Sequence, residues 1–154
     1  AGLVERLRER GVRIAVRGRG WEEGRIGLSE MIRMFSASRI NLNLSNASVS
    51  ESLEKDGERP LLQIKGRDFE VPACGGFLLT QENPELNDYF EPGKEIAVYR
   101  DTDDLLEKIE YYLAHDEERE RVRKAGYDRF LKEHTMLSRL ETIFSRVLSG
   151  ERAE

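Results

Sequence analysis

The stretch from residue 66 to residue 80 constrains the fold most, because it predicts a loop, a short helix and a buried strand in direct succession. Residues 68–74 predict a short helix, in which Pro72 is tolerable only within the first turn. The pair Gly75–Gly76 would end that helix, and the apolar run 77–80 is typical of a buried strand. A loop that leads into a helix start is also a common place for proteins to hold phosphate groups.

Helix and strand patterns alternate along most of the chain. Alternating apolar residues predict further strands at 12–16, 40–44 and 96–99, and helical spacing predicts helices over 2–10, after Ser29, around 83–89 and in the remainder from about residue 101. This order favours an α/β class, a Rossmann-like three-layer domain with a mainly parallel sheet and a helical carboxyl-terminal segment.

Three helices are expected in that carboxyl-terminal segment, capped by Asp101 or Thr102, by Asp116 and by Thr135. The first and the last carry apolar residues at helical spacing, which predicts that both bury one face in the core. These stripes are Leu105, Leu106, Ile109 and Leu113 in the first helix, and Leu137, Leu140, Ile143, Phe144, Val147 and Leu148 in the last.

Composition narrows the class of protein. The 154 residues suit one domain, expected over 1–150, with a frayed tail at 151–154. A net charge of −5 argues against charge-driven binding to nucleic acid. No apolar run approaches the roughly 18 residues that a membrane-spanning helix needs, so we expect no integral membrane segment. The single cysteine, Cys74, excludes an internal disulfide and fits a cytoplasmic location.

Candidate ligand-binding residues follow three predicted strands, because ligands of parallel α/β sheets bind at the carboxyl ends of the strands. Gly18 follows the first strand, although an incomplete dinucleotide pattern there also fits a plain turn. Asn43 lies near the end of the second, where an edge strand is an equal alternative. Thr80 ends the strand after the glycine pair, and we expect all three ends on one rim with the loop at 66–70.

Charged residues around the predicted helix at 68–74 could bind a diphosphate. Lys65 and Arg67 are cations beside a helix start, although such residues are often solvated loop charges. Glu70 could accept hydrogen bonds from two ribose hydroxyls, or it could simply complement the helix start or pair with Arg67. Gly75 fits a helix cap, whereas Gly76 could let the backbone approach a ligand.

Metal sites are not indicated by the sequence. His115 and His134 stand apart in polar helix ends and belong to no ligand cluster. The chain has no nucleophile elbow, no phosphate loop of the Gly-x-x-x-x-Gly-Lys type and no Cys-x-x-Cys pair. We therefore expect no metal and no cofactor.

The residues just described resemble the carboxyl-terminal half of a GT-B-fold glycosyltransferase, closest to the "glycosyl transferases group 1" and the spore-maturation protein CgeB group. That group carries the pattern Arg-x-Phe-Glu-x-x-Ala-Cys-Gly-Gly, matched here by Arg67, Phe69, Glu70, Ala73, Cys74, Gly75 and Gly76. The resemblance continues through 77–80, 85–90 and 92–96 to 99–101, and again over 125–135.

This resemblance implies that the chain binds a nucleoside-diphosphate sugar as the donor substrate of a metal-independent glycosyltransferase. It implies that Glu70 holds the ribose, that Lys65 and Arg67 lie near the diphosphate, and that Gly75 and Gly76 shape the pocket floor. It also implies a partner, because the amino-terminal domain that carries the acceptor site is absent from this chain. Leu62 stands where related retaining enzymes carry a second glutamate, which puts a role for that acid in doubt.

Two other functions compete with donor binding. A non-catalytic binding module could retain this fold, because fold does not fix function. A receiver-like signalling domain would need acids at a strand end, where this chain carries Gly18 and Ser45 instead. The sequence leaves the sugar, the nucleobase and the acceptor open.

Overall fold

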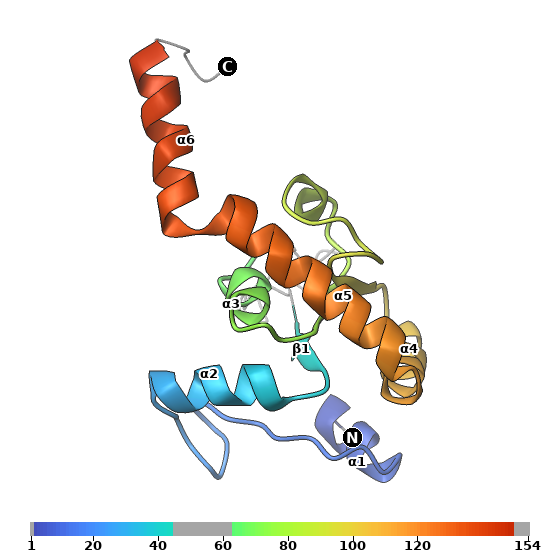
Figure 1. Cartoon of the computed structure of the whole chain (residues 1–154). Coiled ribbons are helices and arrows are strands. Elements are labelled where there is room, and N and C mark those ends of the chain that lie inside the picture. The colour runs from blue at the N-terminus through green and yellow to red at the C-terminus, as the bar shows by residue number, and fades with distance from the viewer. Residues whose placement is uncertain (1, 45–62, 150–154) are drawn as a thin grey trace, which may run out of the picture. The chain divides into compact units, whose positions relative to one another are not determined.

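The computed structural model describes residues 2–44 and 63–149, and the chain divides into two compact units, 1–34 and 35–154. Figure 1 shows the helices and strands of the chain, coloured from the amino to the carboxyl terminus. Residues 47–59 are polar and lack periodicity, which predicts a long loop, but they lie outside the described residues. Leu62 and the predicted tail at 151–154 also lie outside them.

The first unit contains helix α1 (Leu3–Glu9), whose Leu7 is buried, and the start of helix α2 (Leu28–Ala37). The strand predicted at 12–16 is wrong. These residues alternate between half-buried and exposed, as the pattern predicts, but they form no ladder. A strand needs a neighbour to satisfy its amide and carbonyl groups, and the described residues of this unit supply none.

The second unit contains a parallel sheet in the order β1-β2-β3. The strands are β1 (Asn41–Asn43), β2 (Leu78–Gln81) and β3 (Ala97–Tyr99), each within one or two residues of its predicted place. Helix α3 (Arg67–Ala73) connects β1 to β2, and a 3-10 helix, η2 (Pro84–Asp88), connects β2 to β3. The expected α/β class and Rossmann-like parallel sheet are confirmed.

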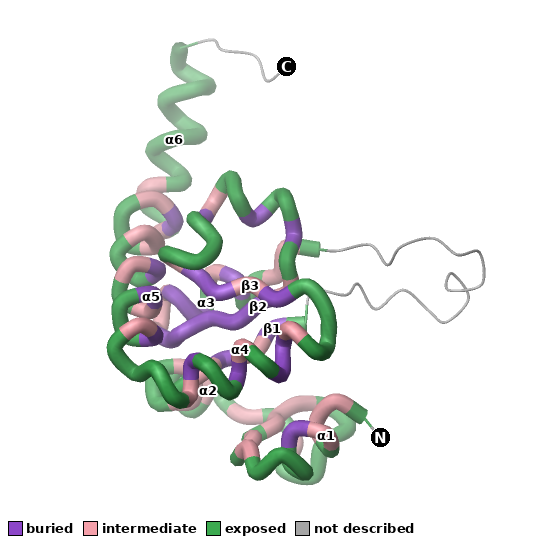
Figure 2. Tube along the Cα trace, turned by 90° about the vertical axis from the view of Figure 1, so that its right-hand side faces the viewer, coloured by how far each residue is buried: buried purple, intermediate pink, exposed green. Residues whose placement is uncertain are grey.

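Successive residues of β2 point to opposite faces of the sheet, and different helices cover the two faces. Leu78 packs with Val71 of α3 and with Leu86, Phe90 and Ile96. The ring of Phe77, on the other side, lies 4.7 Å from the ring of Tyr112 in helix α4 (Thr102–Ala114). Figure 2 shows the strands as largely buried.

Two more helices follow α4. Helix α5 (Asp116–Arg129) continues into a π-helical turn, η3 (Phe130–His134), and helix α6 (Met136–Ser149) begins after Thr135. Thr135 caps α6 as predicted, because its hydroxyl accepts a hydrogen bond from the amide of Ser138.

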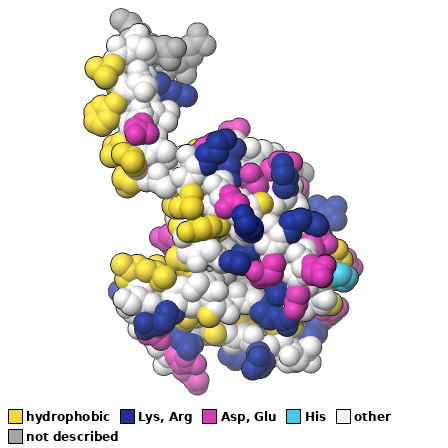
Figure 3. Space-filling view, in the orientation of Figure 1, with side chains coloured by type: hydrophobic (Ala, Val, Ile, Leu, Met, Phe, Trp, Pro, Cys, Tyr) yellow, Lys and Arg dark blue, Asp and Glu magenta, His cyan; other side chains and the backbone are white. Residues whose placement is uncertain are grey.

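The prediction that α6 buries its apolar stripe is wrong. All six stripe residues are exposed, from Leu140 at 41% to Leu148 at 85%, and Figure 3 shows hydrophobic side chains gathered along this helix. Among the described elements, α6 has its main contacts with the adjoining turn η3, and Arg139 near its start lies over the Phe69 ring of α3. The stripe therefore has the spacing of a core face, but its six side chains stay exposed in the described part of the chain.

Candidate functional site

A buried carboxylate joins α3 to the carboxyl ends of the strands. Asp68, in the first turn of α3, is completely buried. Its Oδ1 accepts hydrogen bonds from Asn43 Nδ2 at 2.7 Å and from Thr80 Oγ1 at 2.9 Å, and its Oδ2 accepts one from the Lys65 amide at 2.8 Å. One side chain thus fixes the loop before α3 and the ends of β1 and β2 in a single geometry.

Tyr99 extends this polar cluster to the third strand. Its hydroxyl donates a hydrogen bond to the carbonyl of Asn43 at 3.2 Å, and the residue is 4% exposed. Burial, with the nearby charge of Asp68, raises the pKa of Tyr99 to about 12. The phenol therefore stays a neutral donor at physiological pH.

Three predicted site residues lie on the loop and helix start that carry Asp68. Lys65 is half-buried, and its Nζ donates a hydrogen bond to the Leu44 carbonyl at 2.6 Å. Arg67 and Glu70 are exposed on the first turn of α3, and within the described residues neither has an ion-pair partner. The alternative that Glu70 pairs with Arg67 is therefore not seen, and its carboxylate remains open to a ligand.

Gly75 and Gly76 lie at the other end of α3. Gly75 has a φ of +65° and ends the helix, and its carbonyl accepts a hydrogen bond from Arg123 at 2.7 Å. Gly76 is buried, and a Cβ there would lie 2.6 Å from the Phe35 carbonyl and 2.7 Å from Asn41 Nδ2. Both glycines precede β2, so they lie near its amino end, away from the edge that holds Lys65 and Thr80.

Gly18 belongs to the first unit. It forms a turn that is closed on itself, because the Gly18 amide donates to the Gly24 carbonyl at 2.7 Å and the Gly24 amide donates to the Trp21 carbonyl at 2.9 Å. The second unit thus brings together Lys65, Asn43 and Thr80 through Asp68, while Gly18 forms a local turn in the other unit.

Sequence reasoning missed Asp68 and Tyr99 as parts of this edge. Asp68 precedes the buried residues Val71 and Pro72 by three and four positions, so all three share one face of the helix. That spacing could have identified Asp68 as an acid on a buried face. Tyr99 carried no comparable signal, because its role depends on which strand lies beside β2.

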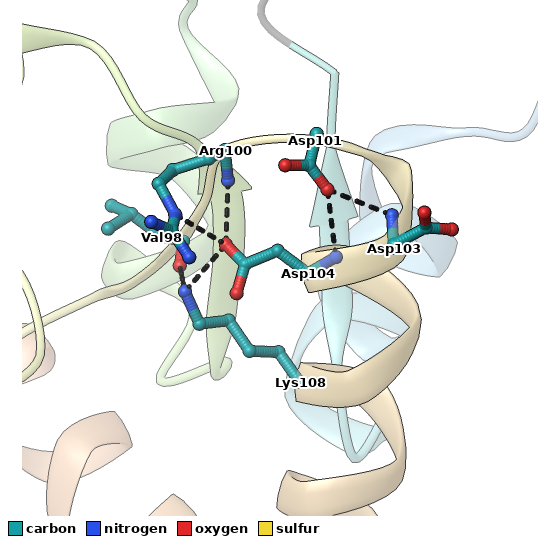
Figure 4. A network of polar contacts seen from close by, with 6 residues as sticks. All are labelled: Val98, Arg100, Asp101, Asp103, Asp104 and Lys108. Carbon is teal, nitrogen blue, oxygen red and sulfur yellow. Dashed lines mark hydrogen bonds and ion pairs between the residues drawn. The ribbon is translucent and has the colours of Figure 1, made fainter.

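The start of α4 closes the carboxyl end of β3 with a second polar network (Figure 4). Asp101 caps the helix by accepting hydrogen bonds from the amides of Asp103 and Asp104. Asp104 Oδ2 accepts from the Arg100 amide at 2.8 Å and from Lys108 Nζ at 2.9 Å. Although burial opposes it, these donors lower the pKa of Asp104. Arg100 and Lys108 are both bound to Asp104, so we interpret this network as structural.

Two open hollows lie beside the turn η2 of the second unit. One has a volume of about 270 Å³ and includes Asn83, whose Oδ1 accepts from the Glu85 amide while its buried Nδ2 has no partner in the part of the chain described. The other has a volume of about 580 Å³ and lies beside Phe69 and Arg139. Groups of three or more metal-ligating side chains are not found among residues 2–44 and 63–149.

Comparison with known proteins agrees with the fold and the sequence pattern. A family described as glycosyl transferase-like matches residues 1–145. The chain belongs to this family. No curated protein matches it, and no solved structure matches it. Within the described residues of this glycosyl transferase-like chain, no helix is both long and apolar enough to cross a bilayer.

Proposed function

We propose that this chain binds a nucleoside-diphosphate sugar and supplies the donor site of a glycosyltransferase. The observation that carries the proposal is the rim at the carboxyl edge of the sheet. There Lys65, Arg67 and Glu70 stand on a loop and helix start that Asp68 anchors to two strands. Membership of a glycosyl transferase-like family supports a sugar-transfer role for that rim.

Each residue has a proposed role that follows from its chemistry. Glu70 presents two acceptor oxygens, which suit the paired hydroxyls of a ribose. Arg67 offers a planar set of donors for phosphate oxygens, and Lys65 adds a second cation beside it. When the sugar is transferred, these cations would stabilise the negative charge of the leaving diphosphate without a metal ion.

The proposal assigns donor binding, and not complete catalysis, to this chain. In the GT-B enzymes that the sequence resembles, the acceptor site lies on another domain. Transfer is therefore proposed to need an acceptor-binding domain as partner. Gly75 and Gly76 take no part in the proposed contacts, because they lie at the far end of α3.

Calorimetric titration of the chain with UDP, GDP and dTDP, without added metal, tests the proposal. We expect saturable binding of one nucleotide, weakened at least about tenfold in Glu70→Ala and Arg67→Ala, since hydrogen bonds to charged groups contribute about 1.5–3 kcal/mol. Glu117→Ala, an exposed acid on α5, is the matched control and should bind as the parent does. Binding that is unchanged in Glu70→Ala, or absent for all three nucleotides, would contradict the proposal.

A non-catalytic interaction module is the second candidate, and one observation favours it. The apolar stripe of α6 is exposed to an extent that is unusual for a monomeric domain. In that case partner binding would depend on the stripe and would survive Glu70→Ala. The same variant therefore separates the two functions.

A further inference from the structure

The first turn of α3 directs two side chains outward and two inward. Arg67 and Glu70 are exposed and lie three positions apart, so they are neighbours on one face of the helix. Asp68 and Phe69, which lie between them in the sequence, are on the opposite face, where Asp68 is buried and Phe69 is half-buried. The contacts that hold this inward pair therefore set the direction in which Arg67 and Glu70 point.

Helix α3 needs such contacts because its own hydrogen bonds are few. It has only seven residues, its N-cap Gly66 makes no side-chain capping bond, and Pro72 has no amide donor. An isolated helix of this length is marginal in water, because nucleating a helix costs more free energy than so few hydrogen bonds offset. Contacts with other elements must therefore fix the first turn.

The two inward side chains are held by different parts of the second unit. Asp68 is bound to the strands and to the loop before α3 by three hydrogen bonds. Phe69 instead packs in an aromatic cluster, in which its ring lies 5.4 Å from the ring of Tyr89, 5.6 Å from that of Phe90 and 5.3 Å from that of His134. His134 is buried, and its Nε2 donates a hydrogen bond to the Tyr89 carbonyl at 2.8 Å.

Arg139 covers one face of the Phe69 ring. Its guanidinium carbon lies 4.4 Å from the centre of the ring, in a cation–π contact. The backbone of Arg139 is held near the start of α6, because its amide donates a hydrogen bond to the Thr135 carbonyl at 3.0 Å. A side chain of the last helix thus contacts the residue that directly precedes Glu70.

We infer that Arg139 is a positioning residue of the proposed nucleotide site and that it acts through Phe69. The cation over the ring holds the inward face of the turn, and this fixes where Arg67 and Glu70 present their donors and acceptors. Hydrogen bonds weaken steeply when their angles change, so a small rotation of the turn is enough to lower affinity. The inference rests on the proposed function, because it concerns the same two outward side chains.

Calorimetric titration compares the parent with Arg139→Ala, with whichever of UDP, GDP and dTDP the parent binds. We expect Arg139→Ala to bind about three- to fivefold more weakly, as the loss of an exposed cation–π contact implies. Arg146→Ala removes an exposed arginine about two turns further along the same helix, and this matched control should bind as the parent does. Urea denaturation checks that each variant is folded, because a contact that only stabilises the fold would leave the affinity of the folded chain unchanged.

A double-mutant cycle with Phe69→Leu decides how Arg139 acts. Leucine keeps an apolar side chain in the cluster but offers no ring for the cation. If Arg139 acts through the ring, Arg139→Ala should change the affinity little once Phe69 is replaced. Effects that add in the double variant would mean that Arg139 contacts the nucleotide directly, and they would overturn the inference.

Amide NMR spectra without nucleotide give a second readout of the turn itself. Arg139→Ala should shift the amides of Arg67 and Glu70, whereas Arg146→Ala should leave them in place. Amides of Arg67 and Glu70 that stay unchanged in Arg139→Ala would overturn the inference, whatever the affinities are.

These results distinguish failure of the inference from failure of the proposed function. If the parent binds a nucleotide and Arg139→Ala binds it equally well, the inference alone is overturned. If the parent binds none of the three nucleotides, the proposed function is contradicted, and the amide spectra alone decide whether Arg139 holds the turn.

Discussion

Helices α4 and α6 have the same kind of sequence but opposite surroundings. Each carries an apolar stripe at helical spacing and begins at a capping side chain. In α4 the residues Leu105, Leu106 and Ile109 are at most 4% exposed, whereas in α6 every stripe residue is at least 41% exposed. Periodicity therefore tells which face of a helix is apolar, and it does not tell what covers that face.

The difference follows from what each helix adjoins. Helix α4 follows β3 directly and contacts it, so its stripe closes over the sheet. Helix α6 follows the turn η3 and, in the described part of the chain, has its main contacts with that turn. Apolar side chains that stay in contact with water contribute little hydrophobic stabilisation to the fold.

The largest difference in unfolding free energy is expected between a truncation in the stripe of α4 and one in the stripe of α6. Leu106→Ala removes a side chain that is 2% exposed, and we expect it to lower the free energy of unfolding by about 3 kcal/mol. Leu140→Ala in α6 should cost less than about 0.5 kcal/mol, because its side chain is already in contact with water. Urea denaturation followed by circular dichroism measures both. Equal losses would show that α6 is packed in solution, and the contrast would fail.

The same contrast recurs within one turn of α3, at a smaller scale. Asp68→Ala would remove the acceptor that Asn43, Thr80 and the Lys65 amide share, and we expect a loss of about 2 kcal/mol in unfolding free energy. Glu70→Ala is the matched control, because this acid is exposed and should change stability by less than about 0.5 kcal/mol. Urea denaturation of the two variants checks this, and the idea of an anchor fails if Asp68→Ala is as stable as the parent.

These pairs show how far the sequence alone could predict this molecule. The strands at 40–44, 77–80 and 96–99 were predictable, because alternating or continuous apolar residues there are covered by nearby elements. The strand at 12–16 was not, since strand formation depends on a neighbour that local sequence does not reveal. Gly18, Asn43 and Thr80 were expected on one edge with the loop at 66–70. Asn43 and Thr80 do meet Asp68 of that segment, whereas Gly18 lies in the other unit. Asp68, which joins Asn43 and Thr80, was missed because its burial depends on how α3 packs against the sheet.

Tyr99 allows the buried polar cluster around Asp68 to be tested by pH. Its pKa is raised from 10.0 to about 12 in the folded chain, so the folded state holds the proton more tightly than the unfolded state does. The resulting stability is complete below about pH 10 and is lost as the pH rises toward about 12, at up to about 1.4 kcal/mol per pH unit.

Comparison of the parent with Tyr99→Phe isolates this effect. The variant lacks the hydrogen bond to Asn43, so it should be about 1 kcal/mol less stable at neutral pH. Because it has no phenol to titrate, the deficit should shrink or reverse above about pH 10. Urea denaturation at several pH values gives both numbers, with the exposed Tyr127→Phe as control. A deficit that stays constant with pH would mean that Tyr99 titrates like an ordinary tyrosine.

Removal of the capping side chains of α4 and α6 should change the unfolding free energy least among these variants. Asp101 accepts two amide hydrogen bonds at the start of α4, and Asp101→Ala should cost about 1 kcal/mol of unfolding free energy, because the buried stripe ties this helix to the sheet. Thr135→Ala should leave that free energy unchanged and instead reduce the helical signal at rest, since an isolated helix of 14 residues is marginal in water. Glu107→Ala, on the exposed face of α4, should change neither quantity.

Circular dichroism without denaturant gives the helical signal, and urea denaturation gives the free energy of unfolding. If Thr135→Ala lowers the unfolding free energy as much as Asp101→Ala does, α6 folds as part of the second unit and its stripe must be covered in solution.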